Sequence, residues 1–172
     1  RRPVPGIGYV STYTDITAQL EAGRRAGQAL KLLEAVMDAV PAVLHVKDRD
    51  LRHRMVNRRF LEISRLERND IIGKTIGEAF APERLDGYRD PDLELLRTGR
   101  PLPFHETKIR LYGPQQWDAL STKVPLLDER GEVSHIVTVE LDISERKKAE
   151  VALRESEELY RLLVDIAPYG IM

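Results

Sequence analysis

The stretch from residue 116 to residue 147, QWDALSTKVPLLDERGEVSHIVTVELDISERK, decides the fold class of this chain. It holds two long candidate strands, 116–127 and 133–142, rich in β-branched and apolar residues. The Asp-Glu-Arg-Gly turn at 128–131 separates them and predicts an antiparallel hairpin. Asp142 and Ser144 are residue types that cap the start of a helix, so a helix is expected directly after the second strand.

The residues upstream of this hairpin complete an antiparallel α+β domain. A third long strand is predicted at 104–112, and two short strands are predicted at 43–47 and 51–56. Short helical segments lie between these two groups of strands, and the last of them, 91–97, ends at a Gly followed by a Pro. Two strands, a helical middle and three strands indicate an α+β fold with an antiparallel sheet.

An internal repeat sets the domain organisation. Residues 8–17, GYVSTYTDIT, match residues 135–144, HIVTVELDIS, at an offset of 127 residues. A period of this length indicates whole domains in series. We therefore expect the last strand of a preceding unit (1–17), a linker or signalling helix (18–40), one complete domain (41–144), a C-terminal signalling helix (145–167) and the start of a following unit (168–172). The strand at 8–14 would be disordered or paired with another molecule.

Both predicted linker helices carry an apolar stripe at heptad spacing. Its members are Ala22, Ala26, Ala29, Leu33 and Val36 in the first helix, and Leu153, Tyr160 and Leu163 in the second. One interpretation is an amphipathic helix that lies on its own domain. The other is a two-stranded seam that joins two copies of the chain in a homodimer, either parallel or antiparallel.

Composition excludes several classes of function. The 172 residues carry 27 Lys and Arg against 28 Asp and Glu, so the net charge of −1 argues against nucleic acid as a partner. The absence of Cys excludes disulfides and thiol chemistry. No apolar run is long enough to span a membrane, and no signal peptide is visible, so we expect a fragment of a cytoplasmic protein.

A search for catalytic and metal-binding motifs finds none, so this chain is not expected to be an enzyme. Its four histidines, His45, His53, His105 and His135, are spread over four predicted strands. We interpret them as surface or half-buried polar residues and expect no metal site.

Six motifs in order resemble a PAS domain over residues 34–147. The first half matches at 46–48, 56–60 and 72–75 (Val-Lys-Asp, Val-Asn-Arg-Arg-Phe and Ile-Gly-Lys-Thr). The second half matches at 96–101 and at Trp117 with 122–126, and the PAC-type closing motif at 128–132 and 142–147. The resemblance implies a five-stranded antiparallel sheet with helices on one face, a pocket between them, and a signalling helix at each end.

The resemblance also implies a function. Tandem PAS units are typical of bacterial sensor histidine kinases, and sometimes of diguanylate cyclases, whose output domains would lie elsewhere in the same chain. We expect a sensory and relay module that passes ligand or neighbouring-domain input through dimeric helices, with Asp142 and Ser144 as the signal exit. The alternative is a scaffold that binds no ligand and only dimerises and spaces its neighbours; a core filled by Phe60, Leu95 and Ile109 would favour it.

The family's cofactors can be tested against the residues. Flavin and coumaryl photochemistry in this family needs a Cys, which is absent, and the family's haem ligand, a His in the helix before the third strand, has no counterpart at 86–93. An unidentified small molecule, or no ligand, remains. The candidate pocket residues, which offer hydrogen-bond donors or stacking area, are Tyr88, His105, Thr107, Trp117 and Thr122; the alternative for each is ordinary packing.

Overall fold

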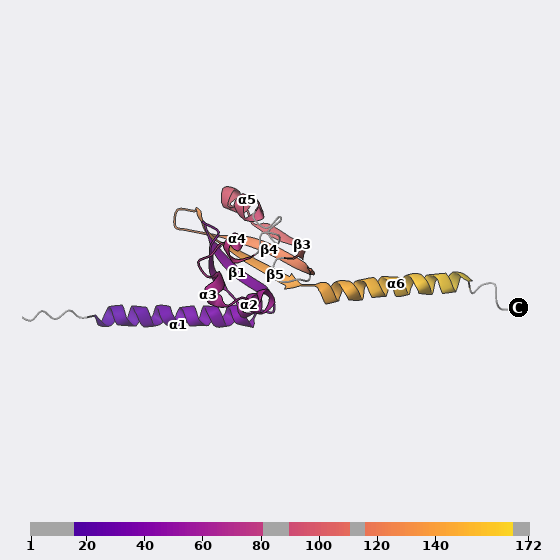
Figure 1. Cartoon of the computed structure of the whole chain (residues 1–172), viewed down its shortest axis with the longest axis horizontal. Coiled ribbons are helices and arrows are strands. Elements are labelled where there is room, and N and C mark those ends of the chain that lie inside the picture. Colours follow the sequence, from indigo (N-terminus) through magenta and orange to yellow (C-terminus); the bar gives the residue numbers. More distant parts are fainter. Residues whose placement is uncertain (1–15, 81–89, 111–115, 167–172) are drawn as a thin grey trace, which may run out of the picture. The chain divides into compact units, whose positions relative to one another are not determined.

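The computed structural model describes residues 16–80, 90–110 and 116–166. In these ranges the chain forms, in order, α1 (Thr17–Ala39), β1 (Val43–Asp48), β2 (His53–Val56), α2 (Arg58–Ser64), α3 (Arg68–Ile71), α4 (Ile76–Ala79), α5 (Asp90–Thr98), β3 (Leu102–Ile109), β4 (Trp117–Leu127), β5 (Val133–Asp142) and α6 (Ser144–Ile166) (Figure 1). The α+β order expected from the sequence is confirmed. Tyr88 and the strand predicted at 8–14 lie outside the described residues.

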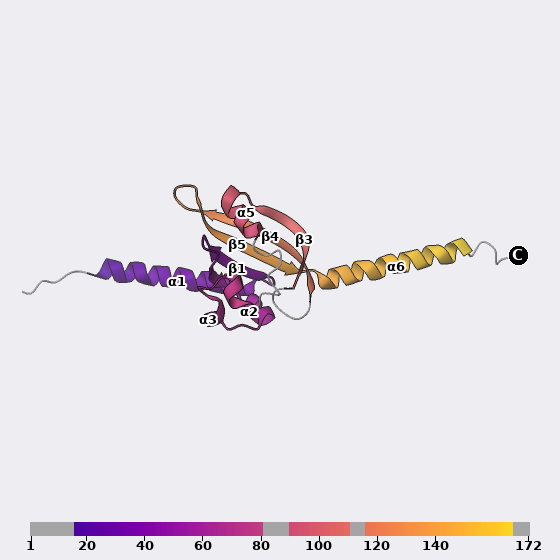
Figure 2. The same cartoon turned by 45° about the horizontal axis from the view of Figure 1, so that its top comes forward.

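All five strands form one antiparallel sheet in the order β2-β1-β5-β4-β3. The central strand, β5, pairs with β1 on one side, and in this ladder Val43 lies opposite Glu140 and Asp48 lies opposite His135. Figure 2 shows α5 beside β4 and β5, and α2 beside β1, in agreement with the contacts between these elements. The first residues of β1 and the last residues of β5 therefore meet at one end of the sheet.

The hairpin between β4 and β5 forms because the Asp128 side chain organises the turn. Its Oδ1 accepts hydrogen bonds from the amides of Arg130 and Glu132, at 2.9 and 3.0 Å. Gly131 closes the turn at φ 77°, a left-handed conformation that side chains disfavour. The turn predicted at 128–131 is confirmed.

Two apolar clusters form the core on the helix-covered face of the sheet. The larger contains Val43, Val56, Phe60, Ile71, Phe80, Ile109 and Ala119. The smaller contains Leu51, Leu95, Val133 and Ile136. The three residues named for a filled core, Phe60, Leu95 and Ile109, are all buried.

Asn57 joins the end of α1 to the domain. Its Oδ1 accepts hydrogen bonds from the amides of Leu44 and Phe60, both at 3.0 Å, and its Nδ2 donates to the carbonyls of Met37 and Ala42, at 3.0 and 2.8 Å. The side chain caps α2 and is itself completely buried. The chain divides into two units after Val36, so these contacts of Met37 lie within the second unit.

The two long helices match in length and register. Each has 23 residues, and the starts, Thr17 and Ser144, lie 127 residues apart, as do the ends, Ala39 and Ile166. This spacing equals the offset of the sequence repeat. The side chains of the apolar stripe are exposed on both helices within this single chain.

Candidate functional site

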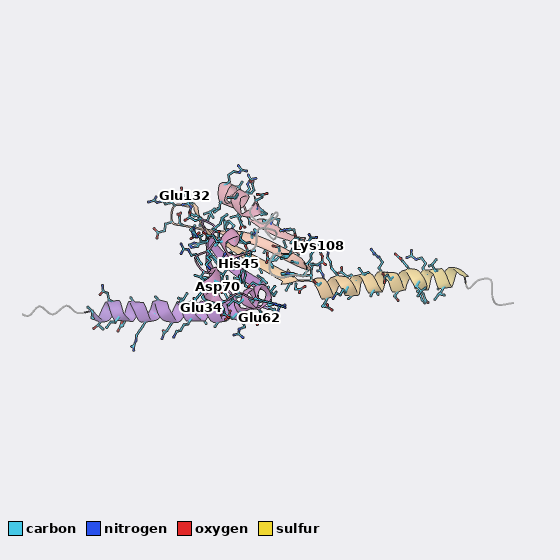
Figure 3. The ribbon with its side chains drawn as sticks, viewed as in Figure 1. Glu34, His45, Glu62, Asp70, Lys108 and Glu132 are labelled. Atoms are coloured by element: carbon cyan, nitrogen blue, oxygen red, sulfur yellow. The ribbon has the colours of Figure 1, made fainter. Side chains whose placement is uncertain are left out.

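A band of buried polar side chains crosses the helix-covered face of the sheet. Strand alternation places His45 and Lys47 on this face with Val43, and the ladders align them with polar residues of β5 and β4. The band contains His45, Lys47, His53, Ser121, Lys123, Thr138 and Glu140, together with Asp92 from α5, all of them buried. Figure 3 places His45 inside the domain, whereas Glu132 and Lys108 lie towards opposite ends of the sheet.

Asp92 bridges two buried lysines at the centre of this band. Its Oδ2 lies 2.6 Å from Nζ of Lys47, and its Oδ1 lies 2.5 Å from Nζ of Lys123. Burial lowers the pKa of Lys47, although the charge of Asp92 opposes this effect. Burial alone would raise the pKa of Asp92, but the two ammonium groups outweigh it and lower that pKa. The triad of Asp92, Lys47 and Lys123 therefore joins α5, β1 and β4 through two buried ion pairs.

The rings of His45 and His53 lie next to each other beside this triad, tilted by 49°. Their ring centroids are 5.2 Å apart, and His45 also meets the ring of Phe60 edge-on at 5.5 Å. Burial, followed by the charge of Lys47, lowers the pKa of His45 well below 6.5 and that of His53 to about 4. Both rings are therefore neutral at pH 7.

The sequence-based interpretation of the histidines was wrong for this pair. It placed all four at the surface or half-buried, which holds for His105 and His135, whereas His45 and His53 are 2% and 0% exposed. For His45 the difference follows from alternation along β1, which places His45 and Lys47 on the same buried face as Val43 and could have identified it. His53 lies on β2, where His53 and Val56 are both buried, so alternation gives no such signal for it.

Acid is expected to destabilise the domain through His53. Because the pKa of His53 is lowered in the folded state, His53 binds a proton in the unfolded chain between pH 6.5 and about 4 but stays neutral in the folded chain. The contribution of neutral His53 to the free energy of unfolding is therefore fully present above pH 6.5 and is lost as the pH falls towards about 4. Urea unfolding should show a loss of about 2–3 kcal/mol by about pH 4.5 from His53 alone.

A pair of variants isolates this effect. His53→Leu should make the stability less dependent on pH across this range. Phe80→Leu, a core substitution that removes no titrating group, should lower stability by the same amount at each pH. An unchanged pH profile for His53→Leu would contradict the assignment.

The structure brings three of the five predicted pocket residues to the helix-covered face. His105 lies opposite Ser121, Thr107 opposite Ala119, and Trp117 opposite Ile109, where it packs against the larger apolar cluster. Thr122 lies on the other face, and its Oγ1 donates to the carbonyl of Leu102 at 2.8 Å. Thr122 therefore does not join this group.

The predicted signal exit is a set of hydrogen bonds where β5 becomes α6. Oδ1 of Asp142 accepts from the amide of Ser144 at 2.9 Å, and Oγ of Ser144 accepts from the amide of Asp118 at 3.1 Å. The amide of buried Ile143 donates to the carbonyl of Asp118 at 2.9 Å. The first turn of α6 is thus bonded to the start of β4.

Ion pairs extend this junction to β3. Glu106 lies 2.6 Å from both Arg146 and Lys147, and Lys147 lies 3.8 Å from Asp118. The hydrogen bond from Lys147, with the charges of Lys147 and Arg146, lowers the pKa of Glu106. The sequence analysis missed Glu106. Strand alternation indicates on which face of the sheet Glu106 lies, but it does not indicate its partner Arg146, which is 40 residues away in the chain.

A groove of about 980 Å³ lies beside the junction. Its lining includes Arg59 and Ile63 from α2, Trp117 from β4, and Asp142, Ser144 and Val151. Predicted pocket and exit residues therefore line the same surface. Cationic and anionic side chains are mixed around it, so the lining favours no single ligand charge.

Two findings limit the chemistry of the described residues. Within the ranges 16–80, 90–110 and 116–166, no three His, Asp or Glu side chains are grouped closely enough to hold a metal ion. No helix in the part of the chain that the structure describes has the length and apolar character needed to cross a bilayer.

The antiparallel sheet, the helices on one face and the helix that follows its central strand β5 define a PAS fold. A family model described as PAS fold matches residues 37–148. The chain belongs to the PAS family. The matched region includes the polar band and the exit junction, and a PAS domain is itself non-catalytic.

Curated relatives place this domain within much longer proteins. The chain is 31% identical over 137 residues to the uncharacterized protein y4lL of Sinorhizobium fredii, covering 78% of this chain and 16% of that protein. It is 30% identical over 167 residues to the two-component sensor PprA of Pseudomonas aeruginosa, covering 94% and 18%. The chain thus spans less than a fifth of the length of these relatives.

Solved structures agree on the fold. The PAS domain of Bordetella pertussis BvgS is 20% identical, with a TM-score of 0.50, and the match covers 76% of this chain and 98% of that one. A sensory box sensor histidine kinase from Vibrio cholerae is 22% identical, with a TM-score of 0.53 and coverage of 72% and 98%.

Proposed function

We propose that this module receives a ligand or a neighbouring-domain input and relays it through dimeric signalling helices to an output domain in the same cytoplasmic protein. A histidine kinase is the output we favour, because the chain resembles a two-component sensor over 94% of its length; a diguanylate cyclase is the alternative. The observation that carries the proposal is the exit junction, where α6 begins two residues after β5 and its first turn is bonded to β4.

The sheet can couple the entry of the domain to its exit. Met37, in the last turn of α1, is held by Asn57, and β1 begins six residues later. Val43 at the start of β1 pairs with Glu140 near the end of β5. A displacement of the end of α1 or of the start of α6 therefore acts on the same β1–β5 ladder. Such coupling would allow the domain to relay a signal with or without a ligand.

In the proposed mechanism, a shift of the sheet changes the hydrogen bonds at Asp142 and Ser144 and the ion pairs of Glu106. The first turn of α6 then rotates or loosens. Because α1 and α6 have equal length, successive units would repeat with the same helical phase. The exposed apolar stripe of each helix would form the dimer seam, and this is where the two helices transmit the change.

Deletions in α6 test the relay in the full-length parent protein. Removal of seven residues around Ser156 preserves the heptad phase and should largely preserve output, whereas removal of four shifts the stripe and should disrupt it. The two variants are matched in position and differ in phase. Equal loss of output from both deletions would contradict the proposal that the signal depends on the heptad phase of α6.

A ligand-free scaffold is the second candidate, and the burial of Phe60, Leu95 and Ile109 favours it. Native mass spectrometry of the purified chain, followed by a denatured extract of the same sample, separates the two candidates. A dimer that carries a non-covalent mass supports a ligand-gated sensor. A dimer without added mass supports the scaffold or a relay driven by its neighbours, and a monomer removes the helix seam from the proposal.

A further inference from the structure

The buried triad has the geometry of a carboxylate receptor. Each oxygen of Asp92 meets a different ammonium group, from Lys47 on one strand and Lys123 on another, at 2.6 and 2.5 Å. The side chains of Asp92, Lys47 and Lys123 are 1%, 2% and 7% exposed. A two-oxygen anion held by two convergent, water-excluded ammonium groups is the arrangement that recognises a carboxylate.

Charge balance defines the class of ligand. The two ammonium groups are balanced by Asp92 and by Glu140, whose charge also acts on Lys47. Exchange of the Asp92 carboxylate for another monocarboxylate would keep this balance. A neutral molecule in its place would leave a buried ammonium uncompensated, which is costly in a low-dielectric interior.

The surroundings of the triad offer further polar capacity. Nε2 of His53 and Oγ1 of Thr138 are buried and have no hydrogen-bond partner among the residues that the structure describes. His53 lies opposite Lys47 in one ladder, and Thr138 lies opposite Lys123 in another. Buried polar groups are normally satisfied, so the Thr138 hydroxyl, which can donate, points to a polar occupant beside the lysines; Nε2 of the neutral His53 ring can only accept, because Nδ1 donates to the carbonyl of Lys74.

We propose that Lys47 and Lys123 form a receptor for a small carboxylic acid, and that Asp92 fills it as a tethered internal carboxylate which such an acid displaces. Displacement removes the ionic link of α5 to β1 and β4 and leaves the helix held by the apolar packing of Leu95. The inference rests on the proposed sensory function only for the use of this event as a signal. Binding is tested separately from the deletions in α6, so either can fail alone.

Acetate is the probe, and chloride at equal ionic strength is its control. Removal of the tether in Asp92→Ala should open the receptor, so acetate and not chloride should raise the unfolding temperature in a saturable manner. The wild-type chain should need at least about tenfold more acetate, because the tethered carboxylate competes at a high effective concentration. Asp92→Ala combined with Lys123→Met should not respond, and Glu94→Ala on the same helix should behave as wild type.

Each outcome decides the proposal. If Asp92→Ala is unfolded, its refolding by acetate but not by chloride supports the receptor, and failure to refold in acetate overturns it. A folded variant that responds equally to both salts, or at the same acetate concentration as the wild type, also overturns it. In the wild-type chain, acetate should accelerate hydrogen exchange in α5 relative to chloride; unchanged exchange overturns displacement.

Discussion

Replacement of Asn57 by alanine is expected to lower the free energy of unfolding by about 3–5 kcal/mol. The side chain makes four hydrogen bonds to backbone groups and is completely buried. Its loss removes a helix cap, worth about 1 kcal/mol, and leaves buried amides and carbonyls without partners, at about 1–3 kcal/mol for each group that water cannot reach. Urea unfolding followed by circular dichroism measures the change.

Asn69→Ala is the matched control for this substitution. Asn69 is exposed on α3, so the same chemical change there should alter stability by less than about 0.5 kcal/mol. Hydrogen exchange adds a second measurement, because Asn57→Ala should loosen the last turn of α1 by releasing the Met37 carbonyl. A loss at Asn57 no larger than at Asn69 would contradict its role as the joint between α1 and the domain.

Asp92→Asn should cost about 3–5 kcal/mol, because it leaves two buried ammonium groups without their shared counter-ion. The substitution keeps the size of the side chain, so the loss reports charge and not a cavity. Urea unfolding at pH 7 measures it. Burial lowers the pKa of Lys47, so this lysine can recover part of the loss by releasing its proton, and the defect should shrink as the pH rises.

Replacement of the whole triad by apolar residues should have the opposite result. Lys47→Met, Asp92→Leu and Lys123→Met, combined with Glu140→Gln because the buried Glu140 carboxylate balances the second lysine, together remove the charges and their desolvation cost, so stability should be unchanged or higher by about 1–4 kcal/mol. Such a variant would fold and yet lack the receptor. If it is as unstable as Asp92→Asn, the triad contributes packing or hydrogen bonds that its charges do not explain.

The strands and the turns could be predicted from sequence because their signals are local. Alternation and β-branched residues placed β4 and β5 within one residue of their observed bounds, and the Asp-Glu-Arg-Gly turn is present as expected. The third long strand begins two residues earlier than predicted and ends at Ile109, before the predicted end at 112. The cap by Asp142 is also local, since its partner Ser144 lies two residues away.

The sequence analysis did not predict the polar site, because its contacts join residues far apart in the chain. Lys47 and Asp92 are 45 residues apart, and Lys123 is 31 residues from Asp92. Periodicity can place a side chain on a face, as it did for Thr107, but it carries no information on which charge from another element lies opposite. His45 was misassigned although it follows the alternation that begins at Val43, and His53 lies on β2, where no such alternation marks it.

The equal 23-residue lengths of α1 and α6 bear on how such proteins change over evolution. A helix turns by about 100° per residue, so connectors of unequal length would present each successive domain at a new angle. In the tandem arrangement that we propose, recombination that inserts or removes one 127-residue unit would leave the orientation of everything downstream as it was. The number of units would then be free to vary without changes in the output domain, and new inputs could be added to an existing protein.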